Sequence, residues 1–233
     1  MGVTPSVLAE LLGTTEVPED TGSIFKINML LTKLPKIKSL VYSPKQAFTG
    51  TFHVNEGYQQ MKKSYKEARN SISPRTFVGE MYCHTLTDNT ILSQDLNKKG
   101  YHTLTFFGLD IPYVLFKENN EQTKKIALEG YLKAINSYLL EPIEGCIATD
   151  KNGELCIETK SPVDLENELG MTEGNIFHGN LSWFFDEKNS GSWGVETKYE
   201  NIFICGAGAK RGGAVSGIPG HNAAMAVLEK FNH

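Results

Sequence analysis

The sequence predicts an α+β fold with a mixed sheet of several strands, helices packed on it, and a strand-loop-helix unit at the C-terminal end. Three observations favour this class. In residues 23–31, Phe25, Ile27 and Met29 alternate with more polar residues, as in a strand with one solvated face. Residues 121–140 place apolar side chains at helical spacing. Residues 201–233 pass from an apolar run through a glycine-rich loop into another helical pattern.

The composition is that of a globular protein and excludes several functional classes. The chain has 233 residues, of which 40% are hydrophobic and 21% charged, and its net charge is −4. Because Lys and Arg are scattered among acidic residues, we expect no nucleic-acid partner. No run approaches the roughly 18 apolar residues of a transmembrane helix, and residues 1–13 have no basic stretch typical of a signal peptide. We therefore expect a cytoplasmic protein.

The four cysteines are expected to be reduced thiols. No two of them are spaced as Cys-x-x-Cys, which is the signature of a redox or zinc motif. A zinc site would need ligands at closer spacing than these cysteines provide, so we expect no metal centre. The cysteines are Cys83, Cys146, Cys156 and Cys205.

The first part of the chain predicts two helices and two extended segments. Residues 5–13 form a short helix, which Gly13 ends. The strand at residues 23–31 follows, and then a short extended run at residues 50–54. Residues 57–70 predict an amphipathic helix. Its apolar stripe consists of Tyr58, Met61, Tyr65 and Ala68.

The middle of the chain predicts two strands and the longest helix. Residues 76–86 and 101–109 are rich in aromatic and β-branched residues, which favour strands. The helix at residues 121–140 would be closed by Pro142. Its apolar stripe consists of Leu128, Tyr131, Leu132, Ile135, Tyr138 and Leu139.

A turn, a strand and a further helix are predicted next. Asn152 and Gly153 suit a hairpin turn that enters the strand of residues 150–160. Residues 161–170 carry helix start signals, with Ser161 as the capping residue. Residues 202–205 and 216–231 then complete the C-terminal strand and helix.

The loop between that strand and helix is unusually rich in glycine. Backbone without side chains lets N–H groups approach a ligand closely. The start of the following helix, near Ser216, favours anionic or electron-rich groups. The alternative is a glycine-rich turn without a ligand. The five glycines are Gly206, Gly208, Gly212, Gly213 and Gly217.

Two familiar nucleotide motifs do not fit this loop. A Walker A loop needs Lys after its second glycine, whereas Gly213 follows Gly212. The Rossmann fingerprint needs spacing one residue shorter than that of Gly206, Gly208 and Gly212. It also needs a second strand with an acidic residue about 20 positions on, and only 28 residues follow Cys205. We therefore do not expect the loop to be the first unit of a dinucleotide fold.

Residues 205–224, CGAGAKRGGAVSGIPGHNAA, resemble the C-terminal flavin-binding segment of the phytoene-desaturase-like, FAD-dependent oxidoreductases. That family typically shows Cys-Gly-x-Gly, then Gly-Gly-Gly-Val, then Asn-Ala-Ala on a helix. Residues 161–179, SPVDLENELGMTEGNIFHG, resemble its Pro-x-Asp-Leu-Glu segment followed by Gly-Gly-Asn-Ile-Phe-His. Residues 25–35 and 50–58 resemble a bacterial branch of the family. The resemblance extends over nearly the whole chain.

Three departures from the family pattern are small. Ala214 replaces the third glycine of the run and brings a Cβ to a place where backbone approaches flavin. Glu173 and Gly174 replace a glycine pair, and Lys210 and Arg211 replace the commoner His-Pro.

The resemblance also implies the domain organisation of an α/β flavoprotein fragment. Residues 1–200 correspond to a substrate-binding α+β domain. Residues 201–233 correspond to the last strand, loop and helix of a Rossmann-like FAD-binding domain. The Gly-x-Gly-x-x-Gly unit of that domain does not occur before Gly206. We therefore expect the N-terminal FAD-binding half to be absent, and its place to be taken by a separate polypeptide or by a second copy of this chain.

The implied activity is dehydrogenation or isomerisation of an apolar, polyene-like substrate by hydride transfer to FAD. His178 is the candidate catalytic residue; the alternative is a histidine that fixes its own loop. Core or surface roles are expected for His53 and His84. The residues matched to flavin binding are Gly206, Ala207, Gly208, Gly212, Gly213, Ala214, Val215, Gly217 and Asn222. The candidates for a substrate channel, or for local core, are Trp183, Phe184, Phe185 and Trp193.

Because half of the cofactor site would be missing, the isolated chain is expected to bind FAD weakly or not at all and to be inactive. Two alternatives stay open. One is a non-catalytic, self-associating interaction module, because the apolar strand at residues 202–205 needs cover on both faces. The other is one subunit of a split flavoenzyme.

Overall fold

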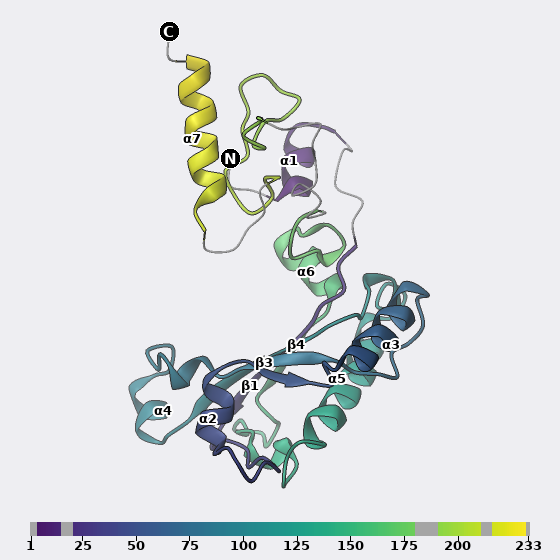
Figure 1. Cartoon of the computed structure of the whole chain (residues 1–233), viewed down its shortest axis with the longest axis vertical. Coiled ribbons are helices and arrows are strands. Elements are labelled where there is room, and N and C mark those ends of the chain that lie inside the picture. The colour runs from purple at the N-terminus through teal and green to yellow at the C-terminus, as the bar shows by residue number, and fades with distance from the viewer. Residues whose placement is uncertain (1–3, 15–20, 180–190, 211–215, 232–233) are drawn as a thin grey trace. The chain divides into compact units, whose positions relative to one another are not determined.

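The computed structural model describes residues 4–14, 21–179, 191–210 and 216–231 (Figure 1). It divides into two compact units, and each is described by itself below. One unit is Ser23–Val163, called here the sheet unit. The other combines Met1–Gly22 with Asp164–His233 and is called the two-segment unit. Helices and a sheet occur together, which confirms the predicted α+β class. These boundaries follow spatial compactness, and the division at residue 200 into substrate and flavin domains stays a prediction.

The sheet unit contains five strands in the order β2-β3-β4-β1-β5. All four neighbouring pairs are antiparallel. The prediction of a mixed sheet is therefore wrong for the described strands. An antiparallel sheet commonly packs one face on a core and leaves the other to solvent. The strands are β1 (Phe25–Leu31), β2 (Phe52–Val54), β3 (Gly79–Tyr82), β4 (His102–Gly108) and β5 (Ile157–Lys160).

The core of this unit lies between one face of the sheet and helix α5 (Asn120–Asn136). Along β1 every second residue is buried, as the alternation in the sequence predicts. Tyr131 of α5 is fully buried. Its ring centroid lies 5.7 Å from that of Phe25 and 5.1 Å from that of Phe106. Gly108 is required here because a Cβ at that position would overlap the Tyr131 ring.

Helix α3 (Tyr58–Arg69) forms where the sequence predicts it, but only Met61 and Ala68 of its predicted apolar stripe are partly buried. Tyr58 and Tyr65 of the predicted apolar stripe are 74% and 55% exposed. The buried residue of the helix is Ser64, whose small side chain allows close approach. Two shorter helices, α2 (Pro44–Thr49) and α4 (Gln94–Lys98), complete this part. The hydropathy pattern thus predicted the helix, and tertiary packing chose its buried face.

The end of helix α5 differs from the prediction, whereas a later predicted turn is present. Helix α5 ends at Asn136 rather than near Pro142. The Asn136 side chain accepts a hydrogen bond from Ile143 N at 2.8 Å and so caps the short turn that begins after Pro142. The predicted turn at Asn152 and Gly153 is confirmed. There Asp150 accepts a hydrogen bond from Asn152 N, and Gly153 has a φ of +83°.

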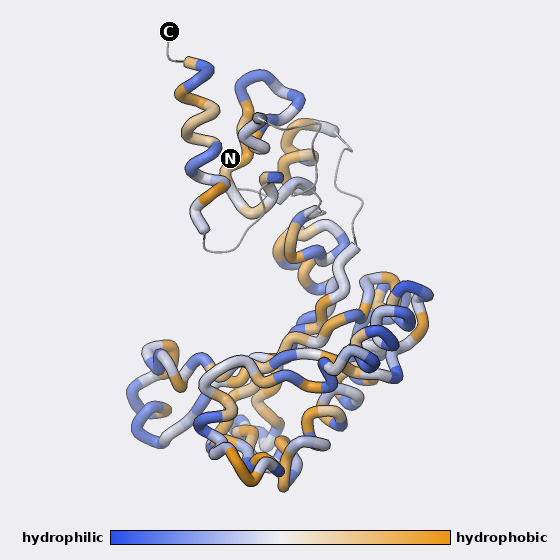
Figure 2. Tube along the Cα trace, in the orientation of Figure 1, coloured by the Kyte–Doolittle hydropathy of each residue, from blue (hydrophilic) through white to orange (hydrophobic). Residues whose placement is uncertain are grey.

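In the two-segment unit, helix α1 (Pro5–Leu11) begins after Thr4, whose hydroxyl accepts a hydrogen bond from Val7 N. Helix α6 (Pro162–Leu169) spans the boundary between the units and is followed by Gly170 with a φ of +64°. Helix α7 (Ile218–Phe231) begins two residues later than predicted. Its hydrophobic and hydrophilic residues are interspersed (Figure 2).

The predicted C-terminal strand is the clearest correction to the sequence-based fold. Within residues 202–205 the structure has one isolated bridge, between Phe203 and Glu196. Ile202, Phe203 and Ile204 are only half-buried, and Cys205 is exposed. A strand needs a neighbouring strand to hold its hydrogen bonds, and the described part of this unit supplies one bridging residue.

Candidate functional site

The predicted flavin-binding segment is described only in part. Gly206, Ala207, Gly208, Gly217 and Asn222 belong to the described residues. The remaining predicted contacts lie outside them, namely Gly212, Gly213, Ala214 and Val215. The same holds for the proposed channel residues Trp183, Phe184 and Phe185.

The first glycines of the segment are anchored to the chain around Gly194. Ile204 N donates to Val195 O at 2.8 Å, and Lys210 N donates to Gly194 O at 2.9 Å. Gly208 has a packing role, because a Cβ there would lie 3.0 Å from the Pro5 ring. This close approach accounts for the glycine without any ligand. A contact between Gly208 and flavin stays a prediction.

Asn222 is buried on helix α7 and connects this helix to the preceding loop. Its Nδ2 donates to Trp193 O at 2.9 Å, and its Oδ1 lies 3.3 Å from His221 Nδ1. The Trp193 indole packs against the small apolar cluster of this unit and donates to Glu229 at 2.8 Å. The contacts of Trp193 are those of local core, one of its two predicted roles.

Glu196 stabilises the loop at residues 193–195, which precedes the glycine segment. This role was not predicted from the sequence. Its carboxylate accepts hydrogen bonds from Trp193 N and Val195 N at 3.1 and 2.9 Å. Burial opposes ionisation of Glu196, but hydrogen bonds from backbone N–H groups outweigh it and hold the pKa of the carboxyl below its usual range. No local motif marks an acid that caps a loop in this way.

His178, the candidate catalytic residue, lies in a segment with unusual backbone conformation. Glu173 and His178 have φ values of +47° and +59°. Within the described residues, His178 Nδ1 is buried and has no hydrogen-bond partner. Burial lowers the pKa of the imidazole, so His178 is neutral near pH 7. A neutral, half-buried imidazole with a spare nitrogen is able to accept or donate a proton. Strained conformations of this kind concentrate at functional sites.

The position of the His178 segment is set by close backbone contacts within the two-segment unit. Gly22 N donates to Glu173 O at 3.0 Å, and a Cβ at Gly22 would overlap Gly174 O. Glu173 N in turn donates to the Glu166 carboxylate at 2.7 Å. Glu173 itself adopts the left-handed region, a conformation that favours glycine.

A second candidate site is a cavity of about 650 Å³ on the open face of the sheet, opposite the core. It is called here the sheet-face pocket. Its apolar lining includes Leu30, Ile91, Phe107 and Ile157. The outward-facing side chains of β1, β4 and β5 supply most of the remaining wall. Binding sites for small molecules have this size and this mainly apolar character.

A chain of polar groups crosses the floor of the sheet-face pocket. Thr105 Oγ1 donates to Asn28 Oδ1 at 3.0 Å, and Asn28 Nδ2 donates to Glu158 at 2.8 Å. The hydrogen bond from Asn28 is the main reason why the pKa of Glu158 lies below its usual range. Lys26 lies over the Phe107 ring, 5.7 Å from its centroid. The pocket therefore combines apolar walls with a few oriented polar groups.

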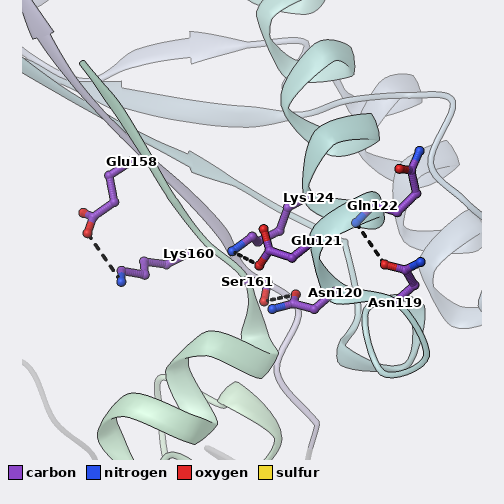
Figure 3. A network of polar contacts seen from close by, with 8 residues as sticks. All are labelled: Asn119, Asn120, Glu121, Gln122, Lys124, Glu158, Lys160 and Ser161. Atoms are coloured by element: carbon purple, nitrogen blue, oxygen red, sulfur yellow. Dashed lines mark hydrogen bonds and ion pairs between the residues drawn. The ribbon is translucent and has the colours of Figure 1, made fainter. Parts of the chain in front are cut away.

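Figure 3 shows how strand β5, which carries Glu158, is joined to helix α5. Lys160 pairs with Glu158 at 3.4 Å along the strand. Ser161, at the end of β5, donates to Asn120 Oδ1 at 2.7 Å, and Asn120 is the first residue of α5. These contacts fix the edge strand of the sheet next to the pocket.

Comparison with known proteins shows close relatives of unknown activity. Uncharacterized proteins of Mycobacterium tuberculosis and Mycobacterium bovis are 46% identical to this chain over 234 residues. The match covers 98% of this chain and 44% of each relative. The chain thus spans less than half the length of these curated relatives. No protein-family model matches the chain, and no solved structure matches it.

A more distant relative carries an informative name. Pyridine nucleotide-disulfide oxidoreductase domain-containing protein 2 of Mus musculus is 26% identical over 225 residues. That match covers 92% of this chain and 36% of the mouse protein. The rat protein of the same name matches equally well. The resemblance to phytoene desaturases stays a prediction. Among the described residues, no helix is long and apolar enough to span a membrane.

Proposed function

We propose that this chain is part of a flavin-dependent oxidoreductase, in which residues 206–222 contribute to FAD binding. The observation that carries the proposal is the similarity, along 92% of the chain, to a relative named for a pyridine nucleotide-disulfide oxidoreductase domain. The glycine-rich segment before α7 supports it independently. The greater length of the relatives supports the idea that other parts of the cofactor site lie beyond this sequence.

The start of helix α7 has the open backbone that a flavin requires. Among the described residues, a Cβ at Gly217 would meet no atom within 4 Å, and one at Gly220 would meet Cys205 O at 4.0 Å. Gly217 has a φ of +71°, which favours glycine. Flavin, when bound, supplies the acceptor for a hydride from the substrate. The chain's own part is to orient the ring at the helix start. Pro219 has no N–H there, and Ile218 N and His221 N donate to Ser216 Oγ and Gly217 O, so the N–H of Gly220 is the candidate donor.

We assign the substrate to an apolar class and place its binding surface in the sheet-face pocket. Leu30, Phe107 and Ile157 give that pocket apolar walls, and the Thr105–Asn28–Glu158 chain offers polar groups for orientation. A polyene or a comparable lipid-like molecule fits such a lining. His178, in the two-segment unit, stays the candidate catalytic residue as a group that holds or moves a proton.

A chimera of a longer relative tests the flavin proposal. The part of the Mycobacterium tuberculosis protein that aligns with this chain is replaced by residues 1–233, and flavin in the purified protein is measured by its visible absorbance. We expect one flavin per chimera, and little or none after Gly217→Val. The matched control, Gly153→Val, also replaces a positive-φ glycine in open space but lies in the sheet unit. A folded chimera without flavin, or a parent protein without flavin, would contradict the proposal.

An interaction module is the second candidate function, and one observation favours it. A groove of about 740 Å³ runs beside helix α7 and is lined by Phe203, Ala224, Val227 and Leu228. Leu228 is 48% exposed. In a split or self-associating protein this surface would be covered by another polypeptide. Sedimentation of the isolated chain checks this: a concentration-dependent dimer that Leu228→Lys abolishes supports the module, and a monomer at all concentrations argues against self-association.

A further inference from the structure

Three side chains with metal-binding groups meet at the β2 edge of the sheet, on strands β2 and β3 and on the turn after β2. They are His53, Glu56 and Glu80, and each offers one ligand atom within 4.8 Å of the other two. His53 and Glu80 are directly paired in the antiparallel register of these strands. Directly paired residues point to the same face of a sheet, so the pairing itself brings the imidazole and the carboxylate together.

The third residue, Glu56, is held in place by a turn that does not depend on any ligand. Asn55, which precedes it, has a φ of +58°. Asn55 N donates to Tyr138 Oη at 3.0 Å, and Asn55 Nδ2 donates to Phe77 O at 2.9 Å. Because both partners belong to other elements of the sheet unit, the direction of the chain at Glu56 is set by tertiary contacts. Ligands supported in this way are typical of functional metal sites.

The Glu56 carboxylate is only partly satisfied. Its Oε2 contacts His53 Nδ1. Its Oε1 is buried and has no hydrogen-bond partner among the described residues, and the side chain is only 17% exposed. A buried carboxylate oxygen without a donor is costly, and a bound ion or water is the usual explanation.

The charge at this place also favours a cation. Within the described parts of the chain, no Lys or Arg forms an ion pair with Glu56 or Glu80. Two carboxylates so close together repel each other unless a positive charge lies between them.

We propose that His53, Glu56 and Glu80 bind one divalent transition-metal ion, of which Zn²⁺ is the best representative. One imidazole and two carboxylates form a nitrogen and oxygen ligand set that zinc accepts in tetrahedral geometry. The His53 side chain is 56% exposed, so the fourth position is open to water. The ion bridges β2, β3 and the turn after β2. The expectation of no metal rested on cysteine spacing, which contains no information about cross-strand pairs.

The test uses the full 233-residue chain, freed of metal with a chelator and titrated with Zn²⁺ by calorimetry. We expect one Zn²⁺ per chain, and binding at least about tenfold weaker in Glu56→Gln and Glu80→Gln. Glu154→Gln, an exposed Glu of the same unit, is the matched control and should bind as the wild type does. Circular dichroism without metal establishes that each variant is folded.

A second readout separates this site from the thiols of the chain. Co²⁺ bound by nitrogen and oxygen ligands lacks the intense sulfur-to-metal charge-transfer band that cysteine ligation produces. We expect Co²⁺ to give visible bands without that feature in the wild type, and to lose them in Glu80→Gln. Equal binding by the wild type and both site variants, a charge-transfer band, or no binding at all would each overturn the proposal. A water molecule would then be the partner of Glu56 Oε1.

Discussion

The sheet unit and the two-segment unit bury apolar surface in very different ways. In the sheet unit, Tyr131, Phe25 and Phe106 are fully buried in one large cluster between helix α5 and the sheet. In the described part of the two-segment unit, the second cluster consists of Val195, Ala209, Ala223 and Ala226. Burying a large apolar side chain contributes about 1.5–3 kcal/mol, and an alanine methyl contributes much less.

This difference shows which contacts hold each unit together. The sheet unit obtains its stability from its own aromatic core. The two-segment unit relies more on polar links, such as those of Asn222 and Glu196, and leaves apolar residues such as Leu228 exposed on α7. A surface of that kind is expected where further polypeptide covers it. The Mycobacterium relatives are more than twice as long as this chain.

The largest expected effect comes from removing the central aromatic ring of the sheet unit. Tyr131→Ala should lower the free energy of unfolding of that unit by about 3–5 kcal/mol, because it leaves a cavity among Phe25, Phe77 and Phe106. Urea unfolding followed by near-UV circular dichroism measures it. Tyr131→Phe, which loses only the hydrogen bond to Leu109 O, should cost about 0.5–1.5 kcal/mol. Similar costs for the two variants would show that the core is less tightly packed than the structure has it.

The next effect tests the close approach of the sheet to that ring. Gly108→Ala should destabilise the sheet unit by about 1–3 kcal/mol, because the added Cβ overlaps Tyr131. Gly145→Ala is the control, since a Cβ there meets no atom within 4 Å. The same urea experiment compares them. A Gly108→Ala variant as stable as Gly145→Ala would contradict the tight contact.

A smaller effect is expected in the two-segment unit, where a polar link replaces a core. Asn222→Ala removes the donor to Trp193 O and should cost about 1–3 kcal/mol. Hydrogen exchange of residues 193–210 and α7 measures it locally. The exposed Asn201 provides the control Asn201→Ala, which should leave exchange unchanged. Unaltered protection in Asn222→Ala would mean that the loop is held by other contacts.

The smallest effect is a dependence on pH in both units. Burial lowers the pKa of His102 in the sheet unit and of His178 in the two-segment unit. A histidine whose folded pKa is lowered binds its proton more weakly in the folded state. Each residue therefore contributes stability above an unfolded pKa near 6.5, and this is lost as pH falls below it. The measurement is the protection of backbone amides from hydrogen exchange, compared between about pH 7 and pH 5. His178→Asn should reduce the loss of protection at low pH in residues 171–179, and His102→Asn should reduce it in β4. Unchanged slopes in both variants would show that the two imidazoles are hydrated.

The elements with strong local patterns were predictable from the sequence. The alternation of β1, the helical stripe of α5 around Tyr131 and the turn at Gly153 all appear where the residues indicate them. Each depends on a periodicity of two or 3.6 residues, or on a conformation that glycine adopts readily, and these are properties of neighbouring residues.

Only the tertiary structure decided how these elements are paired and which faces they bury. It made the sheet antiparallel, turned Tyr58 and Tyr65 of α3 outward, and reduced the strand predicted at residues 202–205 to one bridge at Phe203. It also brought His53 and Glu80, 27 positions apart, into register. Strand pairing and burial depend on residues far apart along the chain, so a local pattern determines the type of an element and leaves its partner open.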